Sequence, residues 1–180
     1  MPSLNLHLFS TPGKDDISDI VEASRPYLED KRDPIVAYLP LGSLYAERWL
    51  ELNETAFKGL GRLQMVNTEL MRQKEIEDIL RDASLVYIPG GNTFLLNHRL
   101  HLSGISLYLK KKIQAGLPLV GFSAGTVLCG PNILTAASMN TVGLNCPSAY
   151  ARKLPKTALD NASGKVRNLK ASIQTNNLFI

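Results

Sequence analysis

The feature that most constrains how this chain folds is a regular alternation of short apolar segments with helical segments over its first 130 residues. Each apolar segment has the alternating or β-branched pattern of a strand, and each is followed by apolar residues at helical spacing. This alternation predicts an α/β fold, a doubly wound and mainly parallel sheet with helices on both faces. The expected strands are residues 4–9, 34–40, 62–66, 84–88 and 117–122, and the expected helices are residues 15–28, 44–59, 74–81, 93–100, 103–115 and 124–129.

Length and composition limit the class of protein. A chain of 180 residues with 44% hydrophobic and 20% charged residues suits one globular domain with its own core. No apolar run reaches the ~18–20 residues that a membrane span needs, so we expect no membrane partner. The first residues lack the basic and apolar regions of a signal peptide, so we expect a cytoplasmic protein.

The pattern changes towards the C-terminus. After about residue 141 neither strand nor helix periodicity persists, so we divide the chain into an α/β domain at residues 1–143 and a basic tail at residues 144–180. Residues 126–180 carry six Lys and Arg but only one acid, Asp160, which accounts for the net charge of +4. The tail has few aromatic residues to accompany these charges, so we predict no nucleic-acid partner.

Other side chains give no sign of a metal or cofactor. Cys129 and Cys146 are too few for a disulfide framework and lack the spacing of metal ligands. No His, Cys, Asp and Glu cluster has such spacing either, and we predict no metal and no cofactor. Trp49, with Leu50 and Leu52, is interpreted as core packing and not as a ligand platform.

The strongest chemical signal is the segment Gly-Phe-Ser-Ala-Gly at residues 121–125, between a predicted strand and a predicted helix. This is the context that a G-x-S-x-G nucleophile elbow requires. The sharp turn would expose the Ser123 hydroxyl above the sheet, and the Ala124 N–H would be placed to bind a developing oxyanion. The alternative is a glycine-bounded turn whose serine caps a helix.

A second turn, Pro-Gly-Gly-Asn-Thr at residues 89–93, also follows a predicted strand and precedes a helix. Glycine lets the backbone approach a substrate closely, so the N–H of Gly91 is a candidate second oxyanion donor. The alternative is a turn whose helix is capped by Asn92 or Thr93. A phosphate-binding loop is not supported, because neither G-K-[ST] nor G-x-G-x-x-G is present.

Together these motifs resemble the dipeptidase E and cyanophycinase family of serine peptidases, whose fold is similar to class I glutamine amidotransferase domains. The matching segments are LVYIPGGNTFLL at residues 85–96 and LPLVGFSAGTVLCGPNILT at residues 117–135, and the resemblance covers residues 1–143. The amidotransferase relatives carry cysteine where this chain has Ser123, which favours the peptidase branch. The resemblance implies a serine hydrolase that cleaves small acidic peptides, such as dipeptides with an N-terminal aspartate.

The acid–base groups of that family have no counterpart here. A serine nucleophile needs a base, and the family places a histidine some tens of residues after the serine, with an acid in between. In this chain His7, His98 and His101 all precede Ser123, so we expect no histidine within hydrogen-bond reach of its hydroxyl. Three explanations stay open: a chain truncated or altered after about residue 143, which we favour; a pseudoenzyme; or an unrelated base.

Two functions from different classes follow. The first is a serine peptidase-like hydrolase of small peptides, with Ser123 as nucleophile and the backbone N–H groups of Gly91 and Ala124 as the oxyanion hole. The second is a catalytically inactive binding domain on the same fold. The two intact motifs favour the first function, whereas the missing histidine favours the second. A homo-oligomer is left open.

Overall fold

The computed structural model describes residues 4–10 and 17–136, and the predicted tail at residues 144–180 lies outside them. Among the described residues, five strands form one sheet with the spatial order β1-β5-β4-β2-β3, and every pairing is parallel. The α/β prediction is therefore confirmed. The strands are β1 (Leu6–Phe9), β2 (Ile35–Tyr38), β3 (Arg62–Met65), β4 (Leu85–Ile88) and β5 (Leu119–Phe122).

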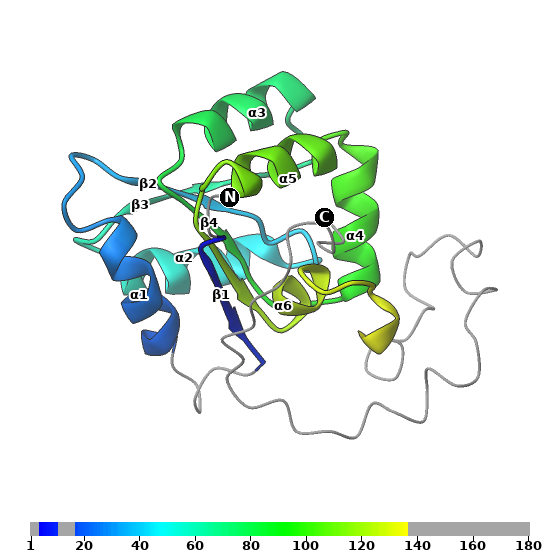
Figure 1. Ribbon diagram of the computed structural model, residues 1–180, viewed down its shortest axis with the longest axis horizontal. Helices are drawn as coiled ribbons and strands as arrows, with labels where there is room; N and C mark the ends of the chain where they lie inside the picture. Colours follow the sequence, from blue (N-terminus) through cyan, green and yellow to red (C-terminus); the bar gives the residue numbers. More distant parts are fainter. Residues whose placement is uncertain (1–3, 11–16, 137–180) are drawn as a thin grey trace.

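Helices cover both faces of this sheet, as predicted. The first two helices and a 3-10 turn pack on one face, and the later helices pack on the other; Figure 1 shows these two groups on opposite sides of the strands. Within the described part of the chain, no helix is long and apolar enough to cross a membrane. The helical elements are α1 (Ser18–Ser24), η1 (Arg25–Tyr27), α2 (Ala46–Ala56), α3 (Gln73–Asp82), α4 (Thr93–Leu102), α5 (Ser106–Gln114), α6 (Ala124–Leu128) and η2 (Leu134–Ala136).

The double winding follows from the handedness of strand–helix–strand connections. From β2 the chain steps outward to β3, with α2 on one face of the sheet; it then returns across β2 to β4, with α3 on the other face. Right-handed crossovers that run in opposite directions place their helices on opposite faces. β5 then enters between β4 and β1, so the strand that leads to Ser123 is an interior strand.

Alternating strand residues divide the interior into two hydrophobic cores. On β4, Val86 and Ile88 pack among α3–α6, whereas Leu85 and Tyr87 pack among α1 and α2. Successive strand residues point to opposite faces, and an interior strand of a parallel sheet is covered on both. All four β4 residues are consequently buried, which is why this segment is a continuous apolar run in the sequence.

One expectation about α2 is wrong. Trp49 and Leu52 are each 50% exposed, so they do not pack in the core. The helix instead turns Leu50 and Asn53 towards the sheet, and Phe57 follows on the same side. These three residues are spaced by three and four positions and share one face; Trp49 lies at the margin of this face, and Leu52 lies on the far side of the helix.

Three buried side chains, one thiol and two phenols, make the free energy of unfolding depend on pH in the alkaline range. Burial raises the pKa of the Cys129 thiol from 9.0 to about 12 and also raises the pKa values of the Tyr38 and Tyr87 phenols. The unfolded chain loses these protons at lower pH than the folded chain. Below about pH 9 these groups do not lower the free energy of unfolding of the protein. The free energy of unfolding then falls as the pH rises through the pKa values of the folded state.

We expect urea unfolding to report a loss of up to ~1.4 kcal/mol per pH unit for each titrating group above its unfolded pKa. A Cys129→Ala variant should delay the onset of this loss from about pH 9 to about pH 10, where tyrosines begin to titrate in the unfolded chain. The same alkaline slope in Cys129→Ala and in the unmodified chain between these two pH values would contradict the assignment.

Candidate active site

Turns line the edge of the sheet where the parallel strands end. Residues 123–124 follow β5, residues 89–92 follow β4, residues 39–43 follow β2 and residues 66–69 follow β3. The spatial order of the strands places these four turns side by side in that sequence. Ligands of open α/β sheets bind outside the carboxyl ends of the strands. Both turns singled out in the sequence therefore lie on the edge of the sheet where a site is expected.

Ser123 joins β5 directly to α6, so the predicted tight strand-to-helix turn is confirmed. Its φ of 51° and ψ of −107° lie outside the regions that L residues normally adopt. Among the described non-glycine residues, only Asp33 and Ser123 have a positive φ. Such a conformation persists only where surrounding structure enforces it, and it is typical of functional sites.

Hydrogen bonds hold this strained turn in place. The Ser123 N–H donates to the carbonyl of Phe9 over 2.8 Å, and the Ser123 carbonyl accepts from Val127 N–H over 3.0 Å. The Thr126 hydroxyl lies 2.7 Å from the Phe9 carbonyl oxygen and 2.9 Å from that of Gly121. The ends of β1 and β5 and the first turn of α6 are thus tied together around the serine backbone.

Glycines next to Ser123 make room for the turn. A Cβ on Gly125 would collide with the carbonyl oxygen of Ile88, which belongs to the backbone of β4. A Cβ on Gly121 would lie 3.0 Å from the carbonyl carbon of Gly125. The helix start therefore packs so closely on β4 and β5 that both flanking positions of the motif require glycine.

The Pro-Gly-Gly-Asn turn lies against the elbow. A Cβ on Gly90 would be 3.3 Å from Ser123 Cβ and 3.0 Å from Cε1 of Phe122. Gly91 has a φ of 140°, which disfavours any other residue. The Asn92 side chain accepts from the N–H groups of Phe94 and Leu95 over 3.0 and 3.1 Å, so the helix cap given above as the alternative for this turn is present, and Asn92 forms it.

The two candidate oxyanion donors, the N–H groups of Gly91 and Ala124, lie next to the place where the Pro-Gly-Gly-Asn turn meets the elbow. Ala124 is the first residue of α6 and is 2% exposed, and the first N–H groups of a helix lack acceptors within the helix. Gly91 immediately follows Gly90, where an added Cβ would meet the Ser123 side chain. Ser123, Gly91 and Ala124 are thus brought to neighbouring turns at one part of the sheet edge.

Where the structure describes the chain, no hydrogen bond joins a histidine side chain to Ser123. Within the described residues, no side-chain hydrogen bond from Ser123 caps α6, which argues against the capping alternative. His7 Nε2 lies 2.8 Å from the Tyr27 hydroxyl, on the sheet face covered by α1, and His101 is exposed on α4. His98 lines a hollow beside α4. No three His, Cys, Asp or Glu side chains in residues 4–10 and 17–136 are grouped as metal ligands.

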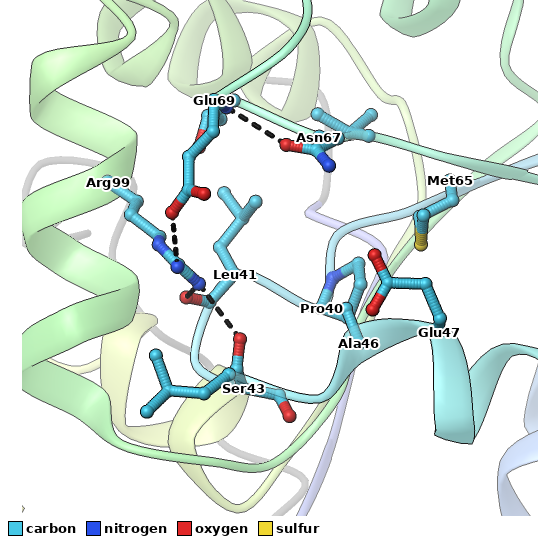
Figure 2. Close-up of a pocket in the computed structure, with 12 residues that line it drawn as sticks. Pro40, Leu41, Ser43, Ala46, Glu47, Met65, Asn67, Glu69 and Arg99 are labelled. Atoms are coloured by element: carbon cyan, nitrogen blue, oxygen red, sulfur yellow. Dashed lines mark hydrogen bonds and ion pairs between the residues drawn. The ribbon is translucent and has the colours of Figure 1, made fainter.

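A small pocket lies further along the same edge, between the turns that follow β2 and β3. Figure 2 shows Arg99 of α4 reaching across it towards Leu41, Ser43 and Glu69. Arg99 Nη1 donates to the carbonyls of Leu41 and Ser43 over 3.0 and 2.8 Å, and Nη2 pairs with the Glu69 carboxylate. The arginine therefore joins three separate segments of this edge.

Sequence reasoning did not single out Thr126 or Arg99. Thr126 stands three residues after Ser123, and this helical spacing is the signal that brings its hydroxyl back over the turn. Arg99 contacts carbonyls 56 and 58 positions away, so no local pattern could have indicated its partners.

Comparison with known proteins gives one family. The model of peptidase family S51 matches residues 8–157. Peptidase E of Haemophilus influenzae is 30% identical over 113 residues, which are 63% of this chain and 51% of that protein. An uncharacterized peptidase of Listeria monocytogenes is 29% identical over 126 residues, which are 68% of this chain and 62% of that protein. The chain spans about half the length of the peptidase E relatives that it matches.

Solved structures agree with the fold. A crystal structure from Listeria monocytogenes, provisionally assigned by its description to peptidase E, superposes with a TM-score of 0.67 and 26% identity. The match covers 81% of this chain and 72% of that one. A peptidase from an acI-B1 Actinobacterium superposes with a TM-score of 0.57 at 20% identity, over 70% of this chain and 56% of that one. At that identity the second match supports the fold alone.

Proposed function

The chain belongs to peptidase family S51, and from this premise we propose that it is a serine peptidase-like protein with Ser123 as its nucleophile. The observation that carries the proposal is the backbone of Ser123, held at a φ of 51° between β5 and α6. A turn of this kind lifts a serine side chain above the sheet edge, where a substrate carbonyl can reach it. A serine that merely capped the helix would need neither the strain nor the hydrogen bonds that maintain it.

In the proposed reaction, Ser123 Oγ attacks the carbonyl carbon of a peptide bond and its proton passes to a base. The carbonyl oxygen becomes an oxyanion that accepts hydrogen bonds from the Gly91 and Ala124 N–H groups. Because both donors are backbone groups on tightly packed turns, little reorganisation is needed when the charge develops. The base returns this proton to the leaving amine as the C–N bond breaks, and a water molecule then hydrolyses the acyl-serine, which releases the acid and restores the Ser123 hydroxyl.

The substrate is part of the proposal. The resemblance to dipeptidase E and the similarity to proteins named peptidase E support small peptides with an N-terminal aspartate. Peptide cleavage in the cytoplasm is also part of the proposal.

A catalytically inactive binding domain is the second candidate. One observation favours it: every histidine of this chain precedes Ser123, and His7 already contacts Tyr27. In this case the elbow and the Pro-Gly-Gly-Asn turn would bind a peptide carbonyl without completing its cleavage. The two candidates share the site and differ in whether a base acts on the Ser123 hydroxyl.

Covalent labelling tests the proposed nucleophile. We expect an uncharged fluorophosphonate to modify the protein at Ser123, slowly, because an oxyanion hole favours attack even without an optimal base. Ser123→Ala should abolish labelling. Ser103→Ala is the matched control, since Ser103 follows the last residue of α4 and its hydroxyl donates to the nearby Leu100 carbonyl. Modification that persists in Ser123→Ala, or that disappears in Ser103→Ala, would contradict the assignment.

A further inference from the structure

We propose that Arg99 is a positioning residue for the oxyanion turn, acting through the loop at residues 41–43. The inference rests on the proposed function, because it concerns the Gly91 N–H that would bind the oxyanion. Arg99 does not touch Ser123 or Gly91 in this arrangement. It fixes the segment on which the Gly91 turn is packed.

The first part of the argument is how the guanidinium is held. Arg99 has an 18% exposed side chain, and one of its terminal nitrogens donates to both Leu41 and Ser43 carbonyls. The other terminal nitrogen pairs with Glu69, whose side chain is 65% exposed. The planar guanidinium carries five N–H donors in fixed directions, so it can grip two carbonyls of one loop at the same time. Figure 2 shows the Arg99 guanidinium extending from α4 to the loop that holds Leu41 and Ser43.

The second part is what the loop touches on its other side. Gly42, between the two gripped carbonyls, accepts a hydrogen bond from the Asn92 N–H over 2.9 Å. A Cβ on Gly91 would lie 2.5 Å from the Gly42 carbonyl oxygen, and a Cβ on Gly42 would lie 3.1 Å from that of Asn92. The two backbones are therefore in direct contact, with no side chain between them to absorb a shift.

Two residues of α4, counting its N-cap, bind the same loop. The helix carries Asn92 at its N-cap and Arg99 about two turns later, and both residues bind the loop at positions 41–43. The Gly90–Gly91 backbone is held between that loop and Ser123. Without the guanidinium, the loop at residues 41–43 keeps its hydrogen bond to Asn92 but loses both bonds to Arg99. The loop on which the Gly91 turn packs is then held less firmly.

Arg99 could either recognise an acidic substrate or position the oxyanion turn, and the charge of the probe distinguishes these two roles. Three of the five N–H donors of Arg99 already bind the protein itself, at two carbonyls and a carboxylate, whereas an arginine that recognised an acidic substrate would act through its charge. A positioning role predicts that reactivity towards an uncharged probe also falls. The test therefore uses an uncharged fluorophosphonate and measures the second-order rate constant for modification of Ser123.

We expect Arg99→Met to label about tenfold more slowly than the unmodified chain, because small misplacements of a catalytic group cost one to two orders of magnitude. Arg99→Lys should retain an intermediate rate, since an ammonium keeps the charge but cannot reproduce the fork. Arg81→Met is the matched control: Arg81 also has two acidic partners, but it lies just before β4, at the opposite edge of the sheet. Circular dichroism confirms that each variant is folded at the assay temperature.

An unchanged rate in folded Arg99→Met overturns the inference, as does an equal loss in Arg81→Met. Should Arg99→Met fail to fold, Arg99→Lys decides: a rate at least threefold below the unmodified chain supports positioning, and an equal rate overturns it. A loss seen with an acidic phosphonate but not with the uncharged probe also overturns it, in favour of substrate recognition. An unmodified chain that never labels at Ser123 removes the proposed function and this inference together.

Discussion

The 180-residue chain is expected to hydrolyse aspartyl dipeptides at least ~10⁴-fold more slowly than a family member with a complete set of catalytic groups. Its three histidines all precede Ser123, and no hydrogen bond joins the serine to a histidine among the described residues. Removal of the base from a serine–histidine pair costs several orders of magnitude in turnover, because the hydroxyl is a poor nucleophile at neutral pH. Turnover by the purified chain, assayed in parallel with peptidase E of Haemophilus influenzae, measures this deficit.

Ser123→Ala is the control for that assay. Hydrolysis by the unmodified chain and by Ser123→Ala should be nearly equal if almost no base acts on the serine. Brisk turnover that disappears in Ser123→Ala would contradict the missing-base argument. His98 and His101 on α4 would then be the groups to replace next, since both follow the Pro-Gly-Gly-Asn turn on the same helix.

Gly125→Ala is expected to lower the free energy of unfolding by more than ~3 kcal/mol, the scale of severe steric or strain effects in a core. The added Cβ would overlap the carbonyl oxygen of Ile88. That oxygen belongs to the middle strand of the described sheet and cannot retreat without disturbing the packing of β4. Urea unfolding followed by circular dichroism measures the loss, and a chain that no longer folds would be its extreme form.

Gly59→Ala provides a matched control for the same chemical change. Gly59 has a positive φ, 81°, which Gly125 does not have, but a Cβ on Gly59 meets nothing within 4 Å. Its cost should be limited to the backbone strain of about 1–2 kcal/mol. Equal losses in the two variants would mean that the steric contact at Gly125 has no special cost, and the close packing of the elbow on β4 would be refuted.

Local patterns were enough to predict the elements. The pattern at residues 84–88 predicts a strand, and the structure has β4 at Leu85–Ile88, buried at all four positions. Residues 74–81 were expected as a helix, and α3 extends this range by only one residue at each end. In both cases the pattern reflects burial: a strand covered on both faces is continuously apolar, and a helix covered on one face repeats every three to four residues.

Contacts between distant residues could not be predicted in this way. The Arg99 bonds to the loop after β2 depend on strand order, which places residues more than fifty positions apart at one edge. The expectation for Trp49 is wrong because the apolar residues of α2 spread beyond one face, and only the side that carries Leu50 packs on the sheet. Composition does not say which face a helix buries when both are apolar.

The same distinction between local patterns and distant contacts applies to the candidate site. The elbow at Ser123 could be predicted because a strand, a glycine-bounded serine and a helix are consecutive in the sequence. Its neighbour could be named as a motif, but the contact between Gly90 and Ser123 required the parallel pairing of β4 with β5. The base could not be assigned, because no histidine or acid stands where the resembled family carries one.

The central claim is that Ser123 attacks a carbonyl whose oxygen is then bound by the Gly91 and Ala124 N–H groups. A crystal structure of the protein after reaction with the uncharged fluorophosphonate tests it most directly, because the phosphoryl oxygen occupies the place of the oxyanion. The account predicts a covalent bond from Ser123 Oγ to phosphorus and a phosphoryl oxygen about 3 Å from both backbone nitrogens. An adduct on Ser123 whose oxygen points away from Gly91 and Ala124, or an adduct on another residue, would contradict it.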